Sequence, residues 1–317
     1  MSSHWMRRAL LALASVATLL TAACGSGTIE SQLQPSRIVV FGDGLSDLGQ
    51  TGPRYTVNDA GIDIWSQEVA LSFGLGMTTA VAGGTSWATG NARVNSKPDA
   101  AGNSATPTVK EQIDAFLASG SIGTNDLLVV GGGIADVIAE MAKVTSGAQT
   151  TDQMLANVKQ AGHDLATQVR RLVDAGATHV VVIGTYDLGR SPWATAIGQK
   201  DLLSQASTAF NDEMLVTVVD LGANVLYVDA AFLFNLMIAN PPAYAMVNST
   251  DPVCTSVDSG PGIGIGAGQV NSALCTTTTL VPNVDYNQYV FADRVYFTPQ
   301  AQRRFGDYAY SKVRARW

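Results

Sequence analysis

Short runs of consecutive apolar residues alternate along this chain with longer segments in which apolar residues recur every three or four positions. The short runs lie at 37–41, 127–130, 179–183 and 225–228. Their length and their content of Val, Ile and Leu predict strands that are buried on both faces. Such strands are typical of a parallel sheet, because the helices that connect parallel strands cover both faces of the sheet.

The intervening segments have the spacing of amphipathic helices. We predict helices at about 62–73 and 200–221. Two more helices are predicted from their apolar faces. The first face carries Val109, Ile113, Phe116 and Leu117, and the second carries Met154, Val158, Leu165, Val169 and Leu172. The alternation predicts a three-layer α/β/α sandwich with a doubly wound parallel sheet of about five strands, as in flavodoxin. We find no internal repeat, and residues 37–317 are predicted to form one domain.

Ligand sites in such sheets lie beyond the carboxyl ends of the strands. The loops that begin at Gly42, Gly131, Gly184 and Asp229 follow the predicted strands. We therefore expect any site to be built from these loops. The carboxylates of Asp43, Asp47, Asp136 and Asp293 are expected near its mouth, or as caps that accept hydrogen bonds from loop amides.

The first 24 residues have the composition of an export signal. Arg7 and Arg8 precede an apolar run at 9–20, which is shorter than the roughly 20 residues of a membrane-spanning helix. We expect residues 1–23 to be a signal peptide. Residues 24–36, rich in Gly, Ser, Thr and Gln after Cys24, are expected to form a tether.

Cys24 directly follows two alanines and resembles the lipidated cysteine of a bacterial lipobox. The resemblance implies an exported lipoprotein. Gly25 at the next position implies the outer membrane of a Gram-negative bacterium. Because Thr21 is less usual at the third position before such a cysteine, ordinary signal cleavage is the alternative.

The composition argues against several classes of partner. Charged residues make up 14% of the chain and the net charge is −7, which argues against nucleic acid, since phosphate contacts require clustered Lys and Arg. Only His163 and His179 remain after the signal, and no phosphate-binding loop with its lysine follows a strand. We therefore predict neither a metal site nor a cofactor.

Cys254 and Cys275 flank a glycine-rich loop at 260–268. An oxidising compartment favours a disulfide between them. Two free thiols are the alternative.

Residues 41–49 read Phe-Gly-Asp-Gly-Leu-Ser-Asp-Leu-Gly. This segment resembles the first block of the GDSL (SGNH) esterases and lipases at every position except one. Gly44 occupies the position of that family's nucleophilic serine. The resemblance implies an acyl-hydrolase scaffold that lacks its reactive hydroxyl.

Two oxyanion elements of that family also have counterparts. The turn that contains Gly83 and Gly84 resembles the block whose amide helps to form the oxyanion hole, although a tight turn that requires glycine gives the same pattern. In the third block Ala135 replaces the asparagine that donates to the oxyanion. Loss of one such donor costs about 2.7–4 kcal/mol of barrier.

The last block places Tyr296 where the family has its catalytic histidine, and Phe297 replaces the following proline. A phenol has a pKa of about 10 and is a poor base at neutral pH. Asp293, which would orient the histidine, is retained. His163 is predicted on the solvated face of its helix and His179 at the start of a strand, so neither can substitute for the missing base.

Further segments at 185–192, 209–211 and 228–254 are similar to the exported bacterial branch of phospholipases, lecithinases and haemolysins. The resemblance covers about residues 37–310. Because three site positions and Phe297 all differ from the pattern, natural divergence explains the changes better than a designed substitution.

We therefore expect a hydrolytically inactive lipoprotein that binds an acyl, glycan or protein ligand in the former active-site cleft. The alternative is an active carboxylic-ester hydrolase in which Ser46 or Ser86 is activated by Asp43, Asp293 or Tyr296. A bare carboxylate is a weak base for a hydroxyl, and Ser46 lies about 200° around a helical turn from position 44. A purely structural envelope protein is a third interpretation.

Overall fold

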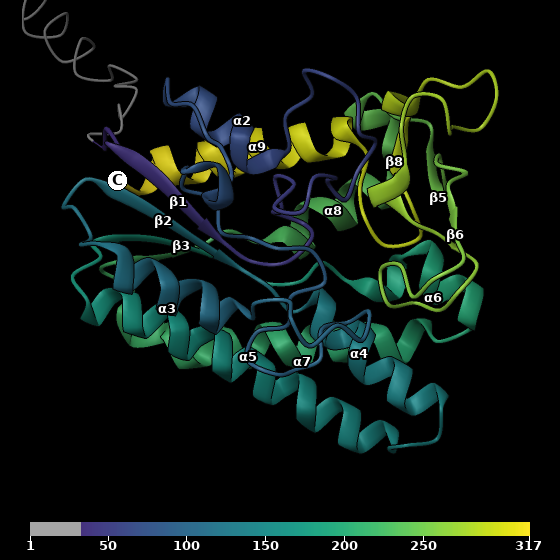
Figure 1. Ribbon diagram of the computed structural model, residues 1–317, viewed down its shortest axis with the longest axis horizontal. Coiled ribbons are helices and arrows are strands. Elements are labelled where there is room, and N and C mark those ends of the chain that lie inside the picture. Colours follow the sequence, from purple (N-terminus) through teal and green to yellow (C-terminus); the bar gives the residue numbers. More distant parts are fainter. Residues whose placement is uncertain (1–32) are drawn as a thin grey trace, which may run out of the picture.

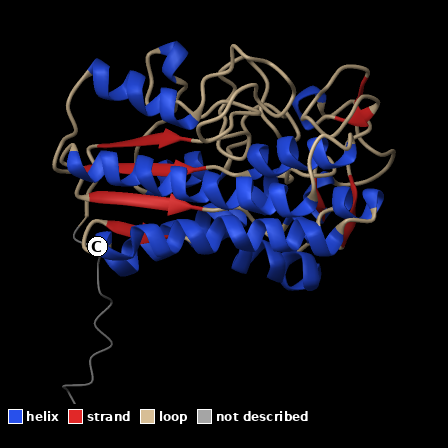
Figure 2. Ribbon diagram, turned by 90° about the horizontal axis from the view of Figure 1, so that it is seen from below, coloured by secondary structure: helices blue, strands red, loops and turns tan. Residues whose placement is uncertain are grey.

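A parallel sheet lies between two layers of helices in the computed structural model, which describes residues 33–317 (Figures 1 and 2). The sheet has the order β1-β2-β3-β4, with every neighbouring pair parallel. Its strands are β1 (Arg37–Phe41), β2 (Asp126–Gly131), β3 (His179–Ile183) and β4 (Val225–Tyr227). The predicted signal peptide and Cys24 lie outside the described residues.

The helices divide between the two faces of the sheet, as the doubly wound prediction requires. In Figure 1, α3 (Val109–Ser119), α5 (Thr151–Asp174) and α7 (Lys200–Val218) lie on one face. On the other face lie α2 (Trp65–Ser72), α8 (Ala230–Ala239) and α9 (Pro299–Arg316). Strands β1, β2 and β3 are almost wholly buried between these layers, and the three-layer α/β/α fold is confirmed.

Residues 85–89 pair with the free edge of β1. The Val40 N–H donates to the Thr85 carbonyl (3.1 Å), and the Trp87 N–H donates to the Val40 carbonyl (2.7 Å). Ser86 bridges both Val40 and Thr79, so the parallel ladder here is only one bridge long. The sheet therefore has four strands and one short paired segment, where about five strands were predicted.

Several helices were not predicted from the sequence. These are α4 (Ile134–Thr145), α6 (Pro192–Ile197), α8 and α9. The segment that forms α4 contains the third motif block and received no helix prediction, although Ile134, Val137, Ile138 and Met141 form a buried face. Within residues 33–317, no helix combines the length and apolar content that crossing a bilayer requires.

A loop-rich region covers the carboxyl end of the sheet on one side (Figure 1). It contains two small sheets, β5 (Asn248–Pro252) with β8 (Tyr289–Phe291) and β6 (Val257–Asp258) with β7 (Gln269–Val270). The predicted disulfide is confirmed, because the sulfur atoms of Cys254 and Cys275 are 1.99 Å apart. Both cysteines are buried, so the bridge anchors the glycine-rich loop to this region.

Candidate active site

The turn after β1 is held tightly at the carboxyl edge of the sheet. The side-chain amide of Gln112 on α3 accepts from the Gly42 N–H and donates to the Gly42 carbonyl, both at 2.9 Å. Asp43 Oδ1 accepts from the Leu45 N–H (3.0 Å). These bonds fix the backbone on both sides of position 44, where the nucleophile of a GDSL enzyme would stand.

Gly44 packs directly against the ring of Tyr296. A β-carbon added at Gly44 would lie 2.8 Å from the Tyr296 hydroxyl oxygen, 2.9 Å from its Cζ and 3.0 Å from Cγ of Tyr55. The backbone conformation of Gly44 is not left-handed and would allow other residues. A side chain is excluded here because it would overlap the neighbouring rings. Gly44 and Tyr296 therefore lie side by side, and two aromatic rings fill the place of the nucleophile.

Tyr296 is fully buried, and its ring contacts that of Tyr55 with centroids 5.0 Å apart. Its hydroxyl has no hydrogen-bond partner within the described part of the protein. Burial raises the pKa of Tyr296 well above its usual value, and the nearby carboxylate of Asp43 raises it further. At neutral pH this group is a phenol, which cannot accept a proton from an attacking hydroxyl.

Gly90 makes room for the second ring. A β-carbon at Gly90 would lie 2.0–2.2 Å from the ring carbons and hydroxyl of Tyr55. The Gly90 N–H donates to Asp47 Oδ2 (2.7 Å), and Asp47 Oδ1 accepts from the Gly49 N–H (2.8 Å). The sequence analysis identifies neither Tyr55 nor Gly90. For Gly90 the available signal was a glycine directly after residues 85–89, and Tyr55 had no comparable signal.

Asp293 supports the loop and orients no base. Its Oδ1 accepts from the N–H groups of Val295 and Tyr296, both at 2.7 Å, and its Oδ2 accepts from the Ser272 N–H (3.0 Å). Burial raises the pKa of Asp293, although these hydrogen bonds oppose the shift. The carboxylate that orients a histidine in the family pattern here binds the backbone that carries Tyr296.

Aromatic packing fixes the same loop from the other side. Phe297 stacks on Phe234 of α8, with ring centroids 3.7 Å apart and nearly parallel planes. The Tyr186 hydroxyl donates to the Val295 carbonyl (2.7 Å). Phe297, which replaces the family's proline, thus packs in the core. This packing holds the ring of the adjacent Tyr296 against Gly44.

The structure does not bring Gly83 and Gly84 to the carboxyl edge beside Gly44. They precede the 85–89 segment, which runs parallel to β1, so they lie toward the end of the sheet where strands begin. Their N–H groups are already used within their own turn, because Gly83 donates to the Ala80 carbonyl and Gly84 to the Thr79 carbonyl, both at 2.9 Å. At the carboxyl edge the corresponding position belongs to Gly90.

Ala135 lies in the first turn of α4 and is fully buried. Its methyl group provides no donor. The preceding Gly133 has a left-handed φ of 106°, and a β-carbon there would lie 2.6–2.8 Å from Phe210 and Thr185. Block three therefore keeps the turn that directs α4 toward the site but lacks the side chain that stabilises an oxyanion.

The candidate substitute nucleophiles have structural partners or no base. Ser46 is 3% exposed, and its Oγ accepts from the Trp65 indole N–H at 3.3 Å. Ser86 is fully buried, and within residues 33–317 its hydroxyl has no hydrogen-bond partner. Burial raises the pKa of Asp43 to about 6, with the Leu45 amide opposing and Asp136 adding to the shift. None of these groups is arranged as a nucleophile hydrogen-bonded to a base.

The two described histidines lie away from this region. His163, on the outer face of α5, has a half-exposed side chain 3.5 Å from Glu213. His179 is the first residue of β3 and packs edge-on against Trp317. As predicted, neither can act as the missing base.

Comparison with known proteins gives a consistent assignment. The model of the GDSL-like lipase/acylhydrolase family matches residues 38–309. An uncharacterized protein in the trpE-trpG intergenic region of Pseudomonas putida is 25% identical in an alignment 339 positions long, which covers 98% of this chain and 54% of that protein. A GDSL esterase/lipase of Arabidopsis thaliana is 25% identical over 155 residues, covering 47% of this chain and 39% of that one.

The chain thus spans about half the length, or less, of the curated relatives it matches. Among solved structures, Est24, a carbohydrate acetylesterase from Sinorhizobium meliloti, aligns at 12% identity with a TM-score of 0.48. That alignment covers 89% of this chain and 99% of Est24.

The contact between Gly44 and Tyr296 predicts coupled effects on stability. Gly44→Ala should lower the free energy of unfolding by about 1–3 kcal/mol, because the new methyl group overlaps the buried ring. In Tyr296→His the smaller ring leaves space, so the double variant should be more stable than the sum of the single effects, by about 1 kcal/mol or more. Chemical denaturation of the four proteins measures this coupling.

Gly76→Ala is the matched control, because a β-carbon at Gly76 meets nothing within 4 Å. If Gly44→Ala is as harmless as Gly76→Ala, the steric account of position 44 is wrong.

Proposed function

The chain belongs to the GDSL-like lipase/acylhydrolase family, and we propose that it has lost hydrolysis and binds a ligand instead of cleaving it. The observation that carries this proposal is the Tyr296 hydroxyl, which lies 2.8 Å from the point where a β-carbon of residue 44 would be. A serine hydrolase needs a hydroxyl at that point and a base beside it. Here the first is absent and the second is a buried phenol.

The oxyanion side supports the same proposal. Position 135 carries a methyl group, and the N–H of Gly90 is committed to Asp47. A tetrahedral intermediate next to residue 44 would therefore lack both the asparagine donor and this amide. Each such donor contributes several kcal/mol to lowering the barrier in a working enzyme.

A ligand in the former cleft would have to displace the rings of Tyr55 and Tyr296. An open apolar pocket of about 350 Å³ lies close by, between the 85–89 segment and α3. Trp87, Val81, Pro107 and Ala115 are among its lining residues. We propose that this pocket, and not the filled cleft, receives a fatty-acyl chain, because its lining is mainly apolar and acyl groups are the substrates of the family.

Gln112 connects this pocket to the degenerate site. It lines the pocket and its side-chain amide holds both backbone groups of Gly42. Gly44 is not among the lining residues, so an acyl chain bound here would lie beside the first block and outside the filled cleft.

No observation in the described residues favours the alternative of an active ester hydrolase with a displaced nucleophile. The Ser46 hydroxyl accepts a hydrogen bond from the Trp65 indole, and Ser86 is fully buried where it pairs with β1.

We also propose that the chain is an exported lipoprotein of the outer membrane, on the strength of the signal-like residues 1–23 and of Cys24. Mass spectrometry of the membrane fraction should find a diacylglyceryl group on Cys24 at the mature N-terminus. A mature form that begins elsewhere and stays in solution would refute this.

The parent protein should show no turnover of short and medium p-nitrophenyl esters above the buffer rate. Gly44→Ser alone should remain inactive, because an unassisted hydroxyl is a poor nucleophile. Gly44→Ser with Ala135→Asn and Tyr296→His should give measurable turnover, since triad residues act as a unit. Hydrolysis by the parent that disappears in Ser46→Ala would show that the enzyme is active with a displaced nucleophile.

Binding of a fluorescent medium-chain fatty acid tests the acyl pocket. Ala115→Phe should weaken binding by about tenfold or more, because the ring fills space that would bury several methylenes at about 0.8 kcal/mol each. Ala118→Phe, an exposed position on the same helix outside the pocket, is the control and should bind like the parent. Equal affinity in all three proteins would contradict the assignment.

A further inference from the structure

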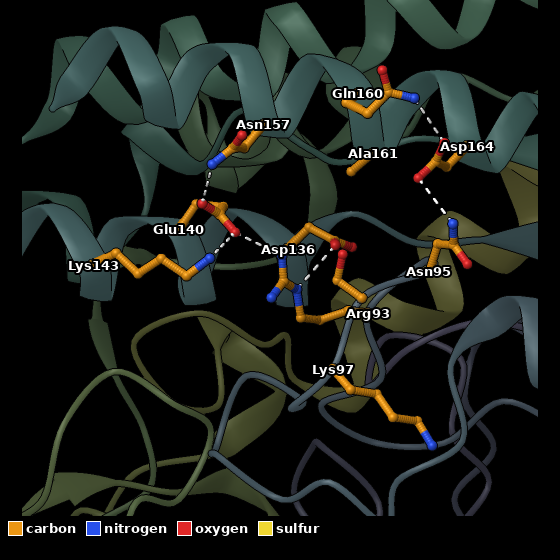
Figure 3. Close-up of a pocket in the computed structure, with 11 residues that line it drawn as sticks. Arg93, Asn95, Lys97, Asp136, Glu140, Lys143, Asn157, Gln160, Ala161 and Asp164 are labelled. Carbon is orange, nitrogen blue, oxygen red and sulfur yellow. Dashed lines mark hydrogen bonds and ion pairs between the residues drawn. The ribbon is translucent and has the colours of Figure 1, made fainter. Parts of the chain in front are cut away.

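A second pocket, of about 280 Å³, lies between α4, α5 and the loop at 93–97, and its lining is almost wholly polar (Figure 3). Helix α5 contributes Asn157, Gln160, Ala161 and Asp164, whose spacing puts them on one face of the helix. The acyl ligand proposed above does not suit this pocket, because Ala161 is its one apolar lining residue. We call it the polar pocket.

Its floor is a buried network of charges. Arg93, whose side chain is 7% exposed, contacts Asp136 Oδ1 through Nε (3.2 Å) and Glu140 Oε1 through Nη2 (2.7 Å). Lys143 also donates to Glu140 (2.7 Å). Buried charges are costly unless they are paired, and here each carboxylate meets a cation. The network therefore holds the Arg93 guanidinium in one orientation at the bottom of the pocket.

The rim of the polar pocket carries side-chain amide oxygens that accept no hydrogen bond from the described residues. Gln160 Nε2 and Asn95 Nδ2 donate to the two oxygens of Asp164, at 2.8 and 3.3 Å, and Asn157 Nδ2 donates to Glu140 at 2.9 Å (Figure 3). Within residues 33–317, no protein donor reaches the amide oxygens of Asn95, Asn157 or Gln160. A ligand that carries several donors would complement these oxygens.

Asp164 adds a negative charge that has no cationic partner among the described residues. The other charges of the lining are balanced, because Arg93 and Lys143 pair with Asp136 and Glu140, and Lys97 pairs with Glu111 just outside. The pocket therefore favours a ligand with a positive charge over one with a negative charge.

We propose that the polar pocket binds one sugar unit, and an amino sugar in preference to an acidic one. Sugar hydroxyls can donate to the rim oxygens and accept from the Arg93 guanidinium, and an ammonium group can pair with Asp164. The volume of about 280 Å³ lies just below the roughly 300 Å³ at which small-molecule sites start, so a single ring is the expected size. Gly44, Ala135 and Tyr296 are not among the lining residues, so the proposal does not depend on whether hydrolysis is lost.

Titration calorimetry of the purified full-length chain with glucosamine, glucose and glucuronate tests the proposal. We expect the affinity to fall in that order. Asp164→Asn should weaken glucosamine binding by about tenfold, the size of a charge-assisted hydrogen bond, and should affect glucose much less. Asp174→Asn, an exposed carboxylate at the end of the same helix, is the control and should change nothing.

Gln160→Ala provides a second variant that keeps every charge, and it should weaken all three sugars. Ala115→Phe should leave sugar binding intact, which separates this site from the apolar pocket. No binding of any sugar by the parent, a preference for glucuronate, or unchanged glucosamine affinity in Asp164→Asn would each overturn the proposal.

Discussion

Steric exclusion between position 44 and the ring of Tyr296 is the constraint on which the rest of this site depends. A side chain at position 44 and a tyrosine at 296 cannot both occupy the space beyond β1, because a β-carbon there would lie under 3.0 Å from the phenol. Protein interiors are packed too tightly to absorb such an overlap without cost. The glycine at position 44 and the tyrosine at position 296 are therefore coupled changes from the family pattern. Together they replace a nucleophile and its base with an aromatic ring that fills the same space.

The surrounding residues are adapted to that exchange. Asp293 no longer orients a base and instead binds the N–H groups on which Tyr296 is carried. Phe297 anchors the next position in the core against Phe234, and Gly90 leaves the room that Tyr55 requires. Tyr296 and Phe297 are fully buried, so the filled cleft is a packed part of the core and not an empty enzyme site.

The sequence predicts most of the sheet, because runs such as Val180–Ile183 have the length and composition of buried strands. The resemblance of the motif blocks assigns Gly44 and Tyr296 to the same site. The sequence does not predict the glycine at the sheet edge, the ring of Tyr55 or the polar pocket, and each has a physical reason. The sequence does not show which glycine lies at the carboxyl edge of the sheet, because that depends on the pairing of residues 85–89 with Val40. Tyr55 lies in a loop without periodicity. The polar residues of α5 carry no motif, and only the packing of this helix beside α4 turns Asn157, Gln160 and Asp164 into a pocket lining.

The central claim is that the native protein contains no activated serine, since the place of the nucleophile is occupied by a buried phenol. Reaction of the native chain with a fluorophosphonate, followed by peptide mass spectrometry, tests this most directly, because the reagent labels serines that an adjacent base activates. We predict no adduct on any serine of the native protein. A stoichiometric adduct on Ser46 or Ser86 that is lost when the protein is unfolded before labelling would contradict the account.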